Sequence, residues 1–192
     1  RTTVAGAGAS ASKNASSAFG HNATASGYRS QTFGSYTEAT QNATTALGYS
    51  AKALANRSIS LGSFANASEN ASIAIGVSAN ASGVQSLAIG PYASASHQKA
   101  TAIGHQAEAS GFSSAAIGVD SIANKGNAQA IGHSAIASAI NATAIGTSAE
   151  ASGKYSSSFG TEANATGEDA IAVGFLATAS DIDSIAIGTS AL

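Results

Sequence analysis

Apolar and small residues alternate along this chain in a pattern that repeats every fourteen residues. One glycine recurs at the same position of every repeat, and the residue before it is large and apolar in thirteen of fourteen repeats. Alanine dominates the positions two before, three after and five after that glycine. Alternation with a period of two predicts β-strands. Each repeat therefore predicts two short strands, Ser-x-Ala-Ile leading up to the glycine and Ala-x-Ala-Ser following it.

The repeating glycine keeps its spacing throughout the chain, with no insertion or deletion. Self-similarity at a fixed short period is the signature of a solenoid. Glycine and the next two residues predict one corner, and the stretch that holds Gly83, Gly111, Gly153 or Gly167 predicts the other. After Gly6, the turn glycines are Gly20, Gly34, Gly48, Gly62, Gly76, Gly90, Gly104, Gly118, Gly132, Gly146, Gly160, Gly174 and Gly188.

These features predict an all-β fold, a parallel β-solenoid in which each repeat forms one coil. Residues 1–192 are expected to form a single domain of about thirteen to fourteen coils, with neighbouring strands about 4.7–4.9 Å apart. A helical fold is disfavoured because apolar residues do not recur at a spacing of 3.6 and glycine every fourteen residues would weaken a helix.

Side-chain size indicates which columns face inward. The alanine columns admit almost nothing larger, which predicts a narrow interior that bulkier side chains would overpack. The residue before the glycine lies on the opposite face of the strand, and burying one such side chain is worth about 1.5–3 kcal/mol. An exposed stripe of this kind predicts self-association about an axis parallel to the solenoid. The predicted interface residues are Phe19, Phe33, Leu47, Leu61, Ile75, Ile89, Ile103, Ile117, Ile131, Ile145, Phe159, Val173 and Ile187.

Charge supports this division into two faces. Charged residues make up only 9% of the chain, against about 25% in ordinary soluble domains. Apart from Arg1, none lies on the strand that ends at the glycine. Lys52, Glu108 and Glu150 are predicted to point outward between inward alanines. The basic side chains are too sparse for the stripe that nucleic acid requires, and the absence of cysteine excludes disulfides and thiolate zinc sites.

Nothing in the sequence predicts catalysis, a cofactor or a metal centre. The histidines are His21, His97, His105 and His133. Even His105 and His133, which share a column, are two coils apart, about 9–10 Å, too far to share a metal with bonds of about 2 Å. We interpret the histidines as solvated turn residues. The carboxylates are scattered along one exposed face, so no Ser/His/Asp set is expected to converge.

Aromatic side chains outside the apolar column are candidates for ligand contact. Aromatic residues on a rigid surface commonly anchor partners, although each ring could instead simply cover the turn beneath it. The candidate contact residues are Tyr28, Arg29, Tyr36, Tyr49, Arg57, Phe64 and Tyr92.

The phrase Asn70–Ala79 (NASIAIGVSA), echoed around Gly90, Gly118 and Gly188, resembles the head repeat of the trimeric autotransporter adhesins, the YadA-like group. The resemblance covers essentially the whole chain. It implies a left-handed parallel β-roll in which three chains lie side by side, displayed on a stalk above a Gram-negative outer membrane. It also implies adhesion to host matrix proteins such as collagen or fibronectin, to cell-surface receptors, or to other bacteria.

The chain departs from the family layout in lacking a neck, a coiled-coil stalk and a membrane anchor, as expected for a head fragment that meets the membrane only through a C-terminal anchor. It also has alanine three residues after the glycine where the family often has serine, which leaves the ligand open. The alternative function is a structural spacer or autoaggregation surface. An ice-binding solenoid is disfavoured because the outward columns mix Asn, Glu, Lys, Tyr and Ser instead of forming a threonine ladder.

Overall fold

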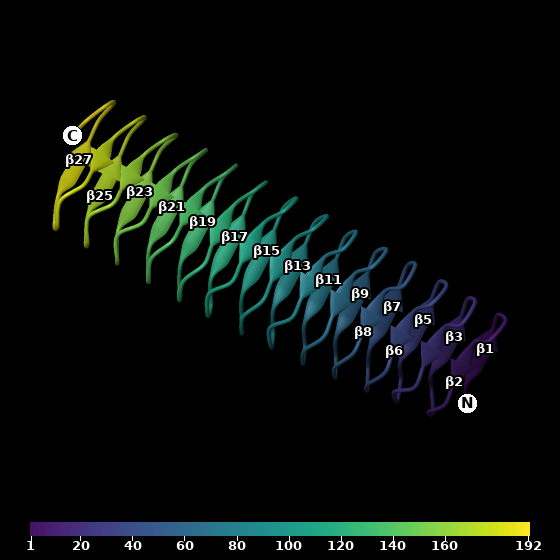
Figure 1. Cartoon of the computed structure of the whole chain (residues 1–192). Helices are drawn as coiled ribbons and strands as arrows, with labels where there is room; N and C mark the ends of the chain where they lie inside the picture. Colours follow the sequence, from purple (N-terminus) through teal and green to yellow (C-terminus); the bar gives the residue numbers. More distant parts are fainter. The chain divides into compact units, whose positions relative to one another are not determined.

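The computed structural model describes all residues from Arg1 to Leu192 and contains only short strands and turns. The chain forms two compact units, Arg1–Ser96 and His97–Leu192. In both units each fourteen-residue repeat forms one coil, and each complete coil contributes one strand to each of two parallel sheets (Figure 1). No helix in the protein is long or apolar enough to cross a membrane.

Sheet 1 of each unit contains the odd-numbered strands, which lead up to the repeating glycine. In the first unit these strands are β1 (Thr3–Ala5), β3 (Ser17–Phe19), β5 (Gln31–Phe33), β7 (Thr45–Leu47), β9 (Ile59–Leu61), β11 (Ile73–Ile75) and β13 (Leu87–Ile89). In the second unit they are β15 (Thr101–Ile103), β17 (Ala115–Ile117), β19 (Gln129–Ile131), β21 (Thr143–Ile145), β23 (Ser157–Phe159), β25 (Ile171–Val173) and β27 (Ile185–Ile187).

Sheet 2 of each unit contains the even-numbered strands, which follow the glycine. In the first unit these are β2 (Ser10–Ala11), β4 (Thr24–Ala25), β6 (Glu38–Ala39), β8 (Lys52–Ala53), β10 (Asn66–Ala67), β12 (Asn80–Ala81) and β14 (Ser94–Ala95). In the second unit they are β16 (Glu108–Ala109), β18 (Ile122–Ala123), β20 (Ile136–Ala137), β22 (Glu150–Ala151), β24 (Asn164–Ala165) and β26 (Thr178–Ala179).

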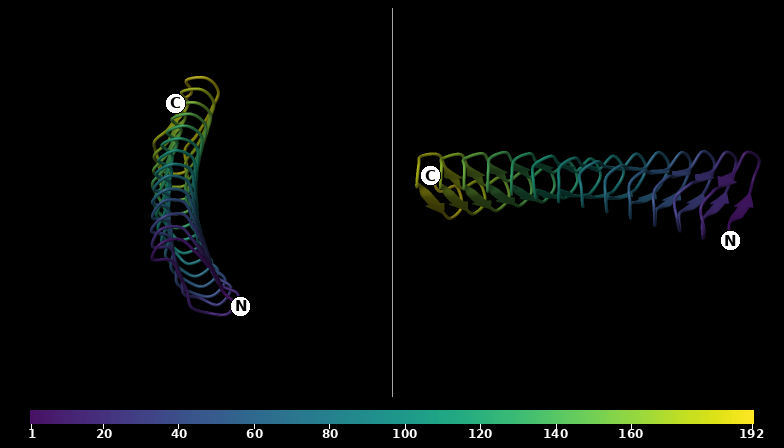
Figure 2. Two further views of the ribbon diagram at one scale, coloured as in Figure 1. Left: turned by 90° about the vertical axis from the view of Figure 1, so that its right-hand side faces the viewer. Right: turned by 90° about the horizontal axis from the view of Figure 1, so that it is seen from below.

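Successive coils pair in parallel and in one register, with each residue opposite its equivalent fourteen positions away. Between β11 and β13, for example, Ala74 lies opposite Ala88 and Ile75 opposite Ile89. The coils of each unit therefore follow one another in chain order (Figure 2). This confirms the predicted parallel solenoid with two strands and two turns per coil.

The strands are shorter than predicted because backbone amides at their ends donate hydrogen bonds within the turns. The amide of Ala79 donates to the carbonyl of Gly76 at 3.3 Å, and that of Ser72 donates to Glu69 at 3.0 Å. These two amides close turns within their own coil, whereas ladder bonds join neighbouring coils. Each strand therefore loses its first predicted residue, and sheet 2 strands also lose their last one, so that they contain two residues.

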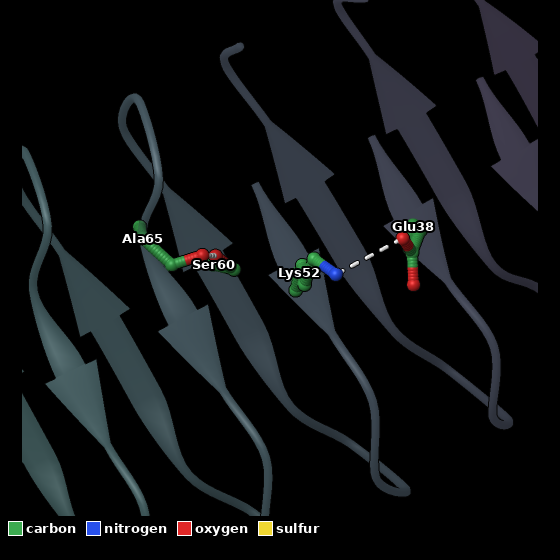
Figure 3. A network of polar contacts seen from close by, with 4 residues as sticks. All are labelled: Glu38, Lys52, Ser60 and Ala65. Atoms are coloured by element: carbon green, nitrogen blue, oxygen red, sulfur yellow. Dashed lines mark hydrogen bonds and ion pairs between the residues drawn. The ribbon is translucent and has the colours of Figure 1, made fainter. Parts of the chain in front are cut away.

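The interior is narrow, as predicted. The alanines of all three inward columns are buried almost throughout, with exposed fractions of 0% at Ala74, Ala79 and Ala81. The largest side chains that are fully buried are threonines and serines, such as Thr32. Ser60 replaces an inward alanine, and its hydroxyl donates to the carbonyl of Ala65 at 2.7 Å (Figure 3). This buried hydroxyl is thus satisfied across the core, whereas the hydroxyls of Thr32 and Ser158 in the same column are buried without a hydrogen-bond partner.

The repeating glycine is required by both backbone conformation and space. Its φ lies between +126° and +141° in every coil, a region that residues with a side chain rarely adopt. A Cβ built on Gly76 would lie 2.5 Å from the carbonyl oxygen of Gly90 in the next coil. The glycine column therefore allows the backbones of successive coils to approach at this corner.

Two other columns adopt the left-handed conformation without glycine, a feature that was not predicted from the sequence. They lie two and nine residues after the repeating glycine and include 26 non-glycine residues with φ between 52° and 61°. Neither column contains valine, isoleucine or threonine, the β-branched residues for which this conformation is most costly. The absence of isoleucine and threonine from both columns, in a chain that has 15 of each, was the sequence signal that could have predicted this conformation.

Serine closes the turn opposite the glycine corner, because the hydroxyl of Ser156 donates to the carbonyl of Gly153 at 2.6 Å in a buried site. We predict that Ser156→Ala lowers the free energy of unfolding by about 1 kcal/mol, measured by chemical denaturation. Alanine fits sterically, since Ala142 and Ala170 are buried at the equivalent positions of neighbouring coils. An unchanged stability would show that this hydrogen bond contributes nothing net.

Candidate functional site

An apolar face covers the outside of sheet 1 in both units. The central residue of each strand points inward, and the residues on either side of it point outward. None of the predicted interface residues is buried inside its own coil. Leu47 is 46% exposed and Ile117 is 36% exposed, and the rings of Phe19 and Phe33 stack with centroids 5.0 Å apart.

A second apolar column widens this face. The residue three before the glycine shares its side of the strand with the residue one before it, as the period of two requires. In several coils it is large and apolar, and it was not among the predicted interface residues although the same periodicity was available. The added apolar residues are Ile59, Ile73, Leu87, Ile171 and Ile185.

Charged side chains are displayed elsewhere on each coil. On sheet 2 the ammonium group of Lys52 lies 3.2 Å from a carboxylate oxygen of Glu38, with both side chains exposed (Figure 3). Lys154 and Glu168 are 3.7 Å apart on the turn opposite the glycine corner. Exposed pairs of this kind contribute about 0–1 kcal/mol. Their effect is therefore to keep this surface hydrated, while the face of sheet 1 remains uncharged.

The seven candidate ligand-contact residues fall into two sets on opposite turns of the coil. Tyr36, Tyr49, Phe64 and Tyr92 lie at the glycine corner, one or two residues after the repeating glycine. Tyr28, Arg29 and Arg57 lie at the opposite turn, eight or nine residues after it. This division follows the two corners that the repeat predicts.

At the glycine corner, rings from four successive coils form an aromatic ladder, defined as His21, Tyr36, Tyr49 and Phe64. Ring centroids are 5.1 Å apart between His21 and Tyr36, 5.7 Å between Tyr36 and Tyr49, and 5.4 Å between Tyr49 and Phe64. Each contact is edge-to-face, with interplanar angles of 75–78°. His21 is exposed at its turn, as predicted, but it also belongs to this ladder.

The ladder has a simple positional cause. Its residues alternate between the first and second positions after the glycine from one coil to the next. Rings at the same position in adjacent coils would stack face to face, one coil apart. The alternation between two positions instead produces edge-to-face contacts, which aromatic rings prefer. The side chains of Tyr36, Tyr49 and Phe64 are 44%, 49% and 57% exposed. The rings pack against one another and keep about half of their surface open to solvent.

The opposite turn of the first unit contains a groove, here called the far-turn groove, with a volume of about 670 Å³. Its lining residues are Tyr28, Arg29, Asn42, Ala43, Asn56, Arg57, Asn70, Ala71, Val84 and Gln85. The guanidinium carbon of Arg29 lies 5.1 Å from the centroid of the Tyr28 ring, a distance typical of cation–π contact. Two residues from each of five successive coils thus form a continuous open depression.

Titratable side chains do not gather into a metal-binding cluster. No group of three or more His, Asp or Glu residues lies close enough to hold a metal ion. All four histidines are exposed on turns.

Comparison with known proteins identifies the repeat. The family model described as the YadA head domain repeat matches residues 11–30, 39–65, 57–79, 67–93, 81–107, 95–121, 123–149, 137–163, 151–177 and 165–191. No curated protein matches the chain. Among solved structures, the collagen-binding domain of the Yersinia adhesin YadA aligns with a TM-score of 0.50 and 26% sequence identity, over 72% of this chain and 69% of that one.

The family match covers most of the chain and follows the same fourteen-residue period that builds the coils. The similar structure is a domain of YadA, the adhesin after which this repeat family is named. The protein is therefore a member of the YadA head repeat family.

Proposed function

We propose that this protein is the head of a bacterial surface adhesin, exposed outside the cell and anchored in the outer membrane through other parts of the full-length protein. In this proposal the head attaches to a host extracellular matrix protein or cell-surface receptor. The supporting observation is the similarity to the collagen-binding domain of YadA, together with a surface built from regular, exposed side chains.

The apolar face supports assembly as a homotrimer. Its exposed aliphatic and aromatic side chains extend along every complete coil of both units without a charge. Soluble proteins rarely leave a contiguous apolar patch of this extent uncovered. Three copies packed side by side about a common axis would cover sheet 1 of each chain and leave sheet 2 and its charges in solvent.

The aromatic ladder is the proposed contact for a matrix polypeptide. Tyr36 and Phe64 are two coils apart, about 9.4–9.8 Å along the stack. One turn of a polyproline II helix is about 9.3 Å long, and collagen is wound from three chains of this type. An extended proline-rich chain lying along the ladder would therefore meet equivalent rings at every turn. Aromatic grooves recognise such chains elsewhere.

We predict that the triple variant Tyr36→Ser, Tyr49→Ser and Phe64→Ser binds immobilised collagen at least about tenfold more weakly than the wild type, since aromatic anchors dominate contact energy. Serine is compatible with the fold, because Ser35, Ser50, Ser63 and Ser78 occupy the same two columns. A solid-phase binding assay measures the effect.

The matched control is Phe175→Ser, which removes an exposed aromatic ring from the first position after a glycine in the second unit. It should bind collagen like the wild type. Equal loss in both variants would contradict a role specific to the ladder. If the wild type failed to bind matrix proteins while coated particles adhered to one another, the protein would instead be an autoaggregation surface or spacer.

A further inference from the structure

We propose that the far-turn groove is a second binding site, separate from the aromatic ladder, and that it binds an extended sulfated polysaccharide. The groove lies on the edge of the coil opposite the ladder, so a ligand in one does not exclude a ligand in the other. Its chemistry is that of an anion-binding surface, for three reasons.

The first reason is the placement of its arginines. Arg29 and Arg57 both lie nine residues after a repeating glycine, in the left-handed conformation, with φ values of 58° and 60°. They are two coils apart, about 9.4–9.8 Å along the stack. Ala43 and Ala71 occupy the same column in the neighbouring coils. Arginine and alanine therefore alternate along this column, and the short alanine side chains leave space beside each guanidinium group.

The second reason is a row of amide donors. The side-chain oxygen of Asn42 accepts a hydrogen bond from the amide of Tyr28 at 3.0 Å, and that of Asn56 accepts one from the amide of Asn42 at 3.1 Å. These bonds fix the orientation of both side-chain amides. Because each oxygen is occupied by the backbone, each Nδ2 group remains a donor for a ligand, and both residues are exposed.

The third reason is the charge of the surroundings. None of the ten lining residues is acidic, and neither arginine is within ion-pair distance of a carboxylate. Glu69, which is half-buried, is the single acidic residue among the five turns that form the groove, and its side chain is not part of the lining. The groove thus offers two unpaired guanidinium groups and a line of neutral donors to an anionic chain.

A sulfated polysaccharide fits these features better than a nucleic acid. Single-stranded nucleic acids require several aromatic platforms for their bases, whereas Tyr28 is the only aromatic side chain in the groove and its ring faces Arg29. A sulfated sugar chain presents widely spaced anionic groups to the guanidiniums and hydroxyl oxygens to the asparagine donors. Arginine is well suited to binding such oxyanions with two parallel hydrogen bonds.

The test is binding of a heparin-derived oligosaccharide to the whole protein, measured by titration calorimetry at about 0.15 M salt so that weak surface attraction is screened. We expect the double variant Arg29→Gln and Arg57→Gln to bind at least about tenfold more weakly, since charge-assisted hydrogen bonds are about twice as strong as neutral ones. Glutamine is tolerated in this column, because Gln85 occupies it with φ 58°.

The control is Lys52→Gln with Lys125→Gln, which removes the same charge from positions outside the groove and should change the affinity by less than about twofold. Asn56→Asp keeps the oxygen that accepts from Asn42 but replaces the Nδ2 donor with a negative oxygen, and it should weaken binding as the arginine variant does.

The proposal is overturned if the two double variants lose equal affinity, if the desulfated oligosaccharide binds equally well, or if oligothymidine binds as tightly. Collagen binding, measured on the same samples, keeps this outcome separate from the proposed function. A wild-type protein that binds heparin but not collagen would contradict only the role of the ladder.

Discussion

Replacing both Ile103 and Ile117 with aspartate is expected to convert the proposed trimer into monomers or aggregates. Both side chains lie on the apolar face, at the ends of the paired strands β15 and β17. In the proposed trimer each would place an unpaired carboxylate in a water-excluded interface, at a cost of several kcal/mol per charge. Light scattering measures the change, from about three times 18.4 kDa to the mass of one chain or to much larger particles.

The control for this prediction exchanges charge on the other sheet. Glu108→Lys with Glu150→Lys alters two exposed side chains of β16 and β22, and the trimer mass should be unchanged. If both double variants lost the trimer equally, the interface would be in the wrong place. A wild-type particle that is stable at 18.4 kDa would contradict the assembly itself.

The second large effect is expected at the glycine column, where Gly146→Ala should lower the free energy of unfolding by about 3 kcal/mol or more. Gly146 has a φ of +140°, and a Cβ at this position would lie 2.2 Å from the carbonyl oxygen of Gly160. The new methyl group therefore meets rigid backbone of the next coil, which must move away. A decrease of about 6–12 °C in the thermal midpoint is the expected readout.

Gly126→Ala is the matched substitution in the same unit. Gly126 lies outside the left-handed region, and a Cβ added there would have as its nearest neighbour the carbonyl oxygen of Phe112, at 4.0 Å. Its stability should change by less than about 0.5 kcal/mol. Similar losses at both positions would show that close backbone approach is not what selects glycine in the repeating column.

The strict period made the fold readable from the sequence. Every coil repeats the same fourteen positions, so each position occurs many times in the sequence. The side-chain sizes found at a position indicate whether it faces the interior or the outside. The inward alanines, the outward apolar column, the glycine corner and the parallel strands could all be predicted in this way. The family resemblance, noted on the phrase around Gly76, agrees with the matched family model.

The candidate binding residues were less predictable, because their arrangement depends on which side chains meet across coils. The ladder needs the geometry of two adjacent columns, in which His21 contacts Tyr36 at an angle of 78°. The far-turn groove needs the hydrogen bonds that orient Asn42 and Asn56. Neither relation has a signature within one repeat.

The sequence by itself determined the coil, its core and its uncharged face, since these follow from local alternation repeated at a fixed period. Only the tertiary structure decided that the rings at one edge contact one another as a ladder and that the arginines at the other edge line a groove. The physical reason is that stacking of coils brings together residues about fourteen positions apart. Contacts between these residues depend on the direction of their side chains at left-handed turns, and that direction cannot be read from the order of residues.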